Sequence, residues 1–185
     1  MSWKSNLAIV VLALGAGAGG LVAGQHWFAM NPPPGSLSLG QPTLEFELPD
    51  LDGGIISPAR FRGRVVLINF WAPWCEPCIR EIPMFKTLRA KYGKERFEIL
   101  GVALDSPDDV RRYVATAAID YPIALADMAD FALMRAYGND RDALPFSVLI
   151  DADGRLRARK LGEYHEAELR RDIEAAMVPG LGARD

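Results

Sequence analysis

Two cysteines three residues apart, placed directly after a buried strand, constrain this chain more than any other feature. Residues 64–71 are apolar on both faces and rich in β-branched side chains, as expected of a central strand that is covered on both sides. The segment Trp74-Cys75-Glu76-Pro77-Cys78 follows closely. Beyond it, apolar residues recur every three or four positions, which predicts a helix with one buried stripe made of Ile79, Ile82, Phe85, Leu88 and Tyr92. The pattern therefore places the cysteine pair at the junction between a central strand and a helix.

Strand-like and helix-like patterns alternate along the rest of the chain. The alternation over 43–48, followed by a glycine turn and by Ile55-Ile56, predicts an N-terminal hairpin. Pro83 should kink the first helix. Later strand-like segments lie at 97–104, 121–125, 146–151 and 156–161, and later helices at 106–117, 129–137 and 166–177. The order predicts an α/β fold with a mixed sheet and an insertion before the strand at 146–151.

The composition allows one ordinary globular domain with an appendage. Of the 185 residues, 50% are hydrophobic, and the 21 Lys and Arg against 24 Asp and Glu give a net charge of −3. The basic residues are scattered rather than clustered, so the chain lacks the positive surface that a nucleic-acid backbone requires. Nucleic acid is therefore not expected as a partner.

The N-terminus differs from the rest of the chain. Residues 7–24 form an uncharged apolar stretch of 18 residues, near the lower limit for spanning a bilayer. Lys4 favours a cytoplasmic N-terminus, and Trp3 and Trp27 stand where interfacial aromatic residues belong. The alternative is a cleaved secretory signal processed near 22–24. Either interpretation places the domain outside the cytoplasm.

The expected organisation of the chain has four parts. Residues 1–28 form the transmembrane anchor or signal, and a proline-rich linker covers 29–39, where three consecutive prolines favour an extended spacer. The domain covers 40–178, and 179–185 form a flexible tail.

The cysteine count limits the chemistry of the pair. Cys75 and Cys78 are the only cysteines, so no structural disulfide framework is possible. Ile79, rather than histidine, follows the pair, which removes haem attachment. Zinc would need two further ligands, and His26 and His165 are the only histidines and show no ligand-like spacing. No metal or cofactor is therefore expected.

The placement of the pair favours thiol-disulfide exchange. Cys75 stands at the start of a helix, where free amide groups and the helix dipole lower the pKa of a thiol. Cys78, one turn later, can attack a mixed disulfide on Cys75 and release the product. Glu76 adds a negative charge that opposes the thiolate, which indicates a pair tuned towards reducing other proteins. Trp74 is expected to shield the sulfur and to contact partners.

The segment from Phe70 to Cys78 resembles the active site of the thioredoxin superfamily. The Cys-Glu-Pro-Cys sequence, the membrane-type N-terminus, the hairpin and the insertion are similar to the TlpA, ResA and CcmG (DsbE) group of oxidoreductases, and the resemblance covers about 40–178. It implies a thioredoxin-like fold anchored once in the bacterial cytoplasmic membrane, with the domain on the periplasmic side. It also implies that the chain reduces disulfides of envelope proteins such as apocytochrome c or copper-site proteins, and that a membrane electron donor reduces the redox-active disulfide again.

The resemblance adds roles for three further positions. Leu144-Pro145 matches the family's cis-proline, which places the backbone of Leu144 beside a substrate strand together with Trp74, Glu76 and Pro77; a trans proline at the start of a strand is the alternative. Glu81 matches an acidic residue near the cysteines that could relay protons, and an ordinary solvated glutamate is the alternative.

Two departures from the family pattern affect these roles. Leu144 stands where Thr or Val is usual, which leaves the side-chain specificity of the groove open. Asn69 replaces the buried Asp of thioredoxins, which shifts proton handling towards Glu81.

Two other functions compete with this interpretation. A peroxiredoxin has a similar hairpin-first layout, but its Pro-x-x-x-Thr pattern beside a lone reactive cysteine is missing here. A copper-delivery protein of the Sco type needs wider cysteine spacing and a late histidine ligand, for which His165 is a weak candidate.

Overall fold

The mixed sheet predicted from the sequence is present in the structure, a computed structural model that describes residues 36–127 and 130–178. Its five strands lie in the order β5-β4-β3-β6-β7. In chain order they are β3 (Val65–Trp71), β4 (Phe97–Leu104), β5 (Ile123–Ala126), β6 (Phe146–Ile150) and β7 (Leu156–Leu161). β3, β4 and β5 are parallel, whereas β6 is antiparallel to β3 and β7 is antiparallel to β6. Every residue of β3 is buried, as its two-sided apolar pattern predicts.

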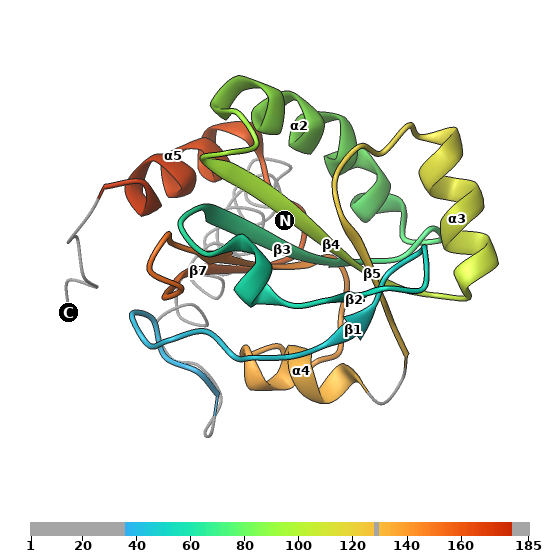
Figure 1. Cartoon of the computed structure of the whole chain (residues 1–185), viewed down its shortest axis with the longest axis horizontal. Coiled ribbons are helices and arrows are strands. Elements are labelled where there is room, and N and C mark those ends of the chain that lie inside the picture. The colour runs from blue at the N-terminus through green and yellow to red at the C-terminus, as the bar shows by residue number, and fades with distance from the viewer. Residues whose placement is uncertain (1–35, 128–129, 179–185) are drawn as a thin grey trace, which may run out of the picture. The chain divides into compact units, whose positions relative to one another are not determined.

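Helices cover both faces of this sheet (Figure 1). They are α2 (Glu76–Tyr92), α3 (Pro107–Thr116), α4 (Phe131–Ala136) and α5 (Glu166–Ala176), with a short 3-10 helix, η1 (Pro58–Phe61). Alternate residues of β3 explain the two layers, because Leu67 packs into the core under α2 and α5 while Ile68 packs into the core under α4 and η1. The central strand is therefore held in place from both sides.

The N-terminal hairpin is much shorter than predicted. Only β1 (Leu48–Pro49) and β2 (Ile55–Ile56) pair. The rest of the predicted strand at 43–48 is irregular and lies beside the β6–β7 turn, where the Thr43 amide donates to the Gly154 carbonyl at 2.7 Å. The apolar-polar alternation of this segment arises because Leu44 and Phe46 pack against the core under α4 and η1, although the segment forms no strand.

Local signals in the sequence explain the start of α3 and the end of α2. The Ser106 hydroxyl accepts a hydrogen bond from the Asp109 amide at 3.2 Å and caps α3. α2 continues through Pro83 and ends at Gly93, whose φ of +79° suits glycine. α4 is shorter than the helix expected over 129–137, since it begins at Phe131.

The expected membrane segment lies outside the described residues, as does the expected tail at 179–185. Within 36–127 and 130–178, no helix has both the length and the apolar character needed to cross a bilayer. The first described residues are tied to the domain. The Leu37 amide donates to the Ala136 carbonyl at 2.8 Å, and the Gly40 amide donates to the Leu156 carbonyl at 2.7 Å.

Candidate active site

Cys75 and Cys78 form a disulfide at the start of α2, with an S–S distance of 2.01 Å and a Cα–Cα distance of 5.3 Å. Cys75 is the N-cap residue of the helix, and Pro77 occupies its first turn. Cys75 retains 5% of its surface and Cys78 none. A partner can therefore approach only Cys75, which is the order of access that attack by one cysteine and resolution by the other requires.

The sheet brings a distant segment to the same end of the molecule. Phe70 near the end of β3 pairs with Phe146 at the start of the antiparallel β6, so the residues before Phe146 lie beside the cysteine turn. The Leu144–Pro145 peptide bond is cis. Pro145 is buried, and its carbonyl accepts a hydrogen bond from the Gly162 amide at 2.8 Å.

Glu81 is a buried acid in the first half of α2. It retains 1% of its surface, although it is charged in water at neutral pH. Its Oε1 accepts a hydrogen bond from the Tyr164 amide at 2.5 Å, whereas Oε2 is buried without a hydrogen-bond partner among the described residues. A carboxylate held in this way loses most of its hydration, and burial raises the pKa of Glu81 to about 8.

Several neighbours modify this pKa in opposite directions. The Tyr164 amide lowers the pKa of Glu81 because it stabilises the charged form, while the negative charge of Glu163 raises it. Lys160 and the side-chain amide of Asn69 lower it further. The result is an acid that can hold or release a proton near neutral pH.

Asn69 lies on the central strand beneath this site. It retains 1% of its surface, and its side-chain Nδ2 donates to the Ser147 hydroxyl at 2.9 Å. The position that carries a buried acid in thioredoxins is thus occupied here by a neutral, hydrogen-bonded amide. Of the two side chains, only that of Glu81 can gain or lose a proton.

A groove of about 870 Å³ opens beside Cys75. The residues that line it are Trp74, Cys75, Glu76, Pro77, Leu104, Asp105, Ser106, Pro107, Ala126, Asp127, Phe131, Asp142, Ala143 and Leu144. Four of the five residues expected to contact substrate therefore line one groove. Pro145, the fifth, is buried next to Leu144.

The groove combines apolar walls with acidic groups. Trp74 is 69% exposed at its edge, which is high for so large an apolar side chain. Four carboxylates line the groove, and none of its described lining residues is Lys, Arg or His. Arg135 pairs with Asp142, and Arg80 lies 3.3 Å from Glu76, so two of the carboxylates have a cationic neighbour. The field in the groove favours a partner that carries positive charge.

Sequence reasoning missed two parts of this site. The first is the turn Gly162–Tyr164, which reaches both Pro145 and Glu81. The second is the part of the groove lined by Asp105 and Asp127, of which Asp105 also accepts a hydrogen bond from the Ser106 amide at 2.6 Å. Neither part carries a local signal, because tertiary contacts create both.

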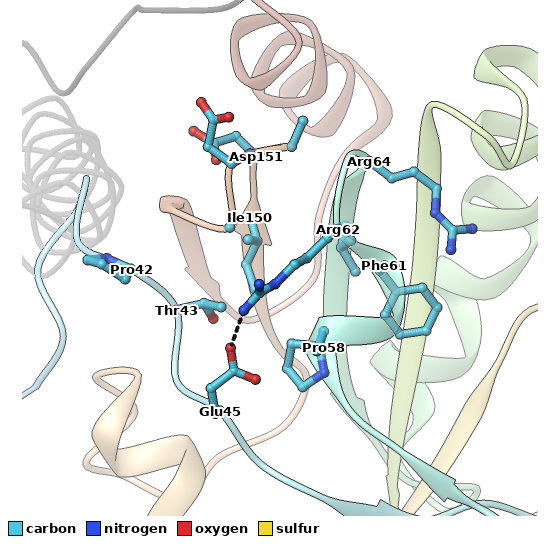
Figure 2. A pocket seen from close by; sticks show the side chains of 14 residues that line it. Pro42, Thr43, Glu45, Pro58, Phe61, Arg62, Arg64, Ile150 and Asp151 are labelled. Atoms are coloured by element: carbon cyan, nitrogen blue, oxygen red, sulfur yellow. Dashed lines mark hydrogen bonds and ion pairs between the residues drawn. The ribbon is translucent and has the colours of Figure 1, made fainter.

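A second, smaller pocket lies far from the cysteines. It has a volume of about 270 Å³ and adjoins Val66 and Ile150, at the opposite end of the sheet. Figure 2 shows the ion pair between Arg62 and Glu45 beside it, at 3.2 Å. Among the described residues, no group of three or more His, Cys, Asp or Glu side chains is placed to hold a metal ion. The described chemistry is therefore concentrated at the cysteine end.

Comparison with known proteins agrees with the geometry. Residues 39–159 match the sequence profile of the AhpC/TSA family. The thiol-disulfide oxidoreductase ResA of Bacillus cereus is 30% identical over 162 residues, which cover 87% of this chain and 90% of that protein. The ResA protein of Geobacillus thermodenitrificans is 30% identical over 141 residues, covering 76% of this chain and 79% of the relative.

A solved structure shows the same fold. The thiol:disulfide interchange protein of the thioredoxin family from Chlorobium tepidum superposes with a TM-score of 0.65 and 29% identity, over 75% of this chain and 97% of the other. The thioredoxin-like fold expected from the residues around the cysteines is thereby confirmed.

Proposed function

Because the chain belongs to the AhpC/TSA family and is a thiol-disulfide oxidoreductase of the ResA and DsbE type, we propose that it reduces disulfides of exported proteins. The observation that most directly supports this proposal is the arrangement of three features at one end of the sheet. An accessible Cys75 is joined to a buried Cys78, a buried acid stands one turn further along α2, and an apolar groove opens beside Cys75.

The reaction uses the cysteines in their order of access. The Cys75 thiolate attacks one sulfur of the client disulfide, so a Cys75–client disulfide forms and the other client sulfur leaves as a thiolate. Cys78 then attacks Cys75, which closes the Cys75–Cys78 disulfide and releases the second client sulfur. Two electrons pass from the protein to the client. A dithiol partner must return them before the next cycle.

Glu81 handles the proton of the second step. A thiol reacts as its thiolate, and Cys78 is buried where no solvent can take its proton. Glu81 follows Cys78 by three residues on the same face of α2, and its pKa of about 8 is close to that of an ordinary thiol. Proton transfer between two such groups is nearly balanced, which is the condition for efficient general acid–base catalysis.

The location of the protein is part of the proposal. The apolar segment 7–24, with Lys4 before it, supports export and a single membrane anchor with the domain on the periplasmic side. An anchored domain of this kind would receive its electrons from a membrane-bound thiol donor. Its clients would be envelope proteins with oxidised cysteine pairs, such as apocytochrome c or copper-site proteins.

The groove narrows the chemistry of the client. Apolar walls formed by Trp74, Phe131 and Leu144 suit aliphatic or aromatic side chains, and the acidic lining suits lysine or arginine. We therefore expect the client cysteine to lie in an extended segment that combines apolar and basic residues.

A trapping experiment tests the proposal. With Cys78→Ala, the Cys75–client disulfide cannot be resolved and should accumulate, so non-reducing electrophoresis followed by mass spectrometry of intact cell envelopes identifies the client. Cys75→Ala together with Cys78→Ala is the matched control. Adducts that form equally in the double variant, or no adduct on Cys75, would rule out the exchange mechanism.

A further inference from the structure

Three consecutive residues after β7 contact three different parts of the active site. The Gly162 amide donates to the Pro145 carbonyl at 2.8 Å, and the Tyr164 amide donates to Glu81 Oε1 at 2.5 Å. Between them, the Glu163 side chain turns to α2 and binds Arg80. Gly162 has a φ of +89°, a conformation that favours glycine and lets the chain turn sharply at this point.

The contact between Arg80 and Glu163 has the geometry of a strong ion pair. Arg80 Nη2 lies 2.7 Å and Nε 3.1 Å from Glu163 Oε2, and Nε lies 3.3 Å from Oε1. Two nitrogens of a planar guanidinium that face one carboxylate fix the angle as well as the distance between the groups. The pair joins α2, one residue before Glu81, to the turn, one residue before Tyr164.

We propose that the Arg80–Glu163 ion pair is a positioning clamp, which holds the Gly162–Tyr164 turn so that its amide stays bonded to the buried Glu81. The two residues act on Glu81 through the turn, and Arg80 also lies 3.3 Å from Glu76 at the groove. The inference concerns the proton-handling step of the proposed function and therefore rests on it. Its test measures Glu81 itself, so the clamp can fail while the exchange mechanism stands.

The surroundings of Glu81 make the turn amide important. Oε2 has no hydrogen-bond partner among the described residues, and Oε1 accepts a hydrogen bond from the Tyr164 amide at 2.5 Å. The charged and titratable groups that face Glu81 are Arg80 on α2, Lys160 on β7, Tyr121 before β5, and Glu163 and Tyr164 on the turn itself. The stabilising effect of the amide is larger than the opposing effect of the Glu163 charge.

Because the Tyr164 amide and the Glu163 charge act on the pKa of Glu81 in opposite directions, two substitutions of Glu163 should shift this pKa in opposite directions. Glu163→Gln removes the negative charge but keeps an oxygen that can accept from Arg80, so the turn stays in place and the pKa of Glu81 should fall. Glu163→Ala removes the charge and the clamp together, so the amide is released and the pKa of Glu81 should rise. If the pair acted only through charge, both substitutions would lower it.

The experiment follows the carboxyl carbon of Glu81 by NMR between pH 5 and 10 in the oxidised protein. Expected results are a lower midpoint in Glu163→Gln and a higher midpoint in Glu163→Ala and in Arg80→Ala. Hydrogen exchange of the Tyr164 amide should be about tenfold faster in the two alanine variants only, because that amide is then no longer held against the carboxylate.

Arg135→Ala is the matched control, since Arg135 also pairs with an acid across a turn, Asp142, but contacts neither Glu81 nor Tyr164. It should leave the Glu81 midpoint and the Tyr164 exchange rate unchanged. A fall of the midpoint in Glu163→Ala, or unchanged Tyr164 exchange in both Arg80→Ala and Glu163→Ala, would overturn the clamp.

Discussion

Two glutamates of this domain are buried to almost the same extent and are held in opposite ways. Glu81 on α2 retains 1% of its surface, and Glu98 on β4 retains 3%. Arg89 approaches Glu98 with nitrogen–oxygen distances of 2.5 Å and 3.1 Å, and Arg64 lies 3.7 Å away. Glu81 has one backbone amide at Oε1 and a buried Oε2 without a hydrogen-bond partner among the described residues.

The difference separates a structural charge from a reactive one. Two guanidinium groups compensate the charge of Glu98, which therefore joins α2 to the sheet. Glu81 lacks such compensation, and it lies three residues after Cys78 on α2, where the proposed exchange reaction moves a proton. Similar burial thus accompanies a network of ion pairs in one place and an acid with a raised pKa in the other.

The largest expected effect is on the pH dependence of stability. The pKa of Glu81 rises from an ordinary 4.5 to about 8 on folding, so its contribution is fully present below pH 4.5 and is lost as the pH rises through 8. At about 1.4 kcal/mol per pKa unit, wild-type protein should lose about 4 kcal/mol relative to Glu81→Gln between pH 5 and pH 9.

Urea denaturation of oxidised wild type and oxidised Glu81→Gln between pH 5 and pH 9 measures this difference in the free energy of unfolding. Glu98→Gln is the control, and it should be less stable than wild type at every pH because it weakens a compensated ion pair. Parallel stability curves for wild type and Glu81→Gln would show that Glu81 is charged throughout.

The next largest effect is expected from removing Arg89, the main partner of Glu98. Arg89→Ala leaves Glu98 buried with Arg64 as its nearest cation, and we expect a loss of about 3 kcal/mol in the free energy of unfolding. The exchange rate of the folded protein should not change. Equilibrium denaturation and a thiol-disulfide exchange assay below the transition separate the two quantities, and a stable but inactive variant would contradict the division of roles.

The rate of thiol-disulfide exchange should depend on Glu81 and not on Glu98. Glu81→Gln keeps the shape of the side chain but cannot accept a proton, so thiol-disulfide exchange should slow by about a hundredfold at pH 7. Stopped-flow measurement with a disulfide-bonded peptide tests this, with Glu98→Gln as the same substitution away from the cysteines. Equal rates for Glu81→Gln and wild type would remove Glu81 from the mechanism.

The smallest effect is expected at an exposed ion pair. Arg62 and Glu45 border the pocket in Figure 2, with side-chain exposures of 75% and 60%. Because solvent screens such pairs, Arg62→Ala should change the free energy of unfolding by less than about 1 kcal/mol, and the exchange rate should not change. Thermal unfolding and the same kinetic assay measure both, and a larger loss would give this end of the sheet a structural role comparable to that of Glu98.

Local patterns predicted the elements that position the cysteines. The apolar run 64–71 became β3, and Ile82, Phe85 and Leu88 of the predicted stripe lie on the buried face of α2, whereas Ile79 and Tyr92 are half-buried. The predicted stripe did not include Glu81, but the helical spacing of Cys78, Glu81, Phe85 and Leu88, which are all buried, was a signal for its burial. A solvated glutamate was the alternative interpretation, and its burial excludes that.

Long-range contacts could not be predicted in the same way. The amide that binds Glu81 belongs to Tyr164, 83 residues later, and its position depends on how β7 pairs with β6. The predicted strand at 43–48 failed for a related reason, because an alternating pattern shows which side chains face the core but not whether a partner strand is present. Clamp and groove are thus products of the fold.

The antiparallel pairing of β3 with β6 has a consequence for biogenesis. A chain made from its N-terminus presents Cys75 and Cys78 well before Pro145 and Tyr164 have been synthesised. Until β6 docks against β3, the thiols have neither a groove to select clients nor a buried acid set in place by the late turn. A newly made molecule is therefore a vulnerable dithiol first and a selective one only after its last strands have paired.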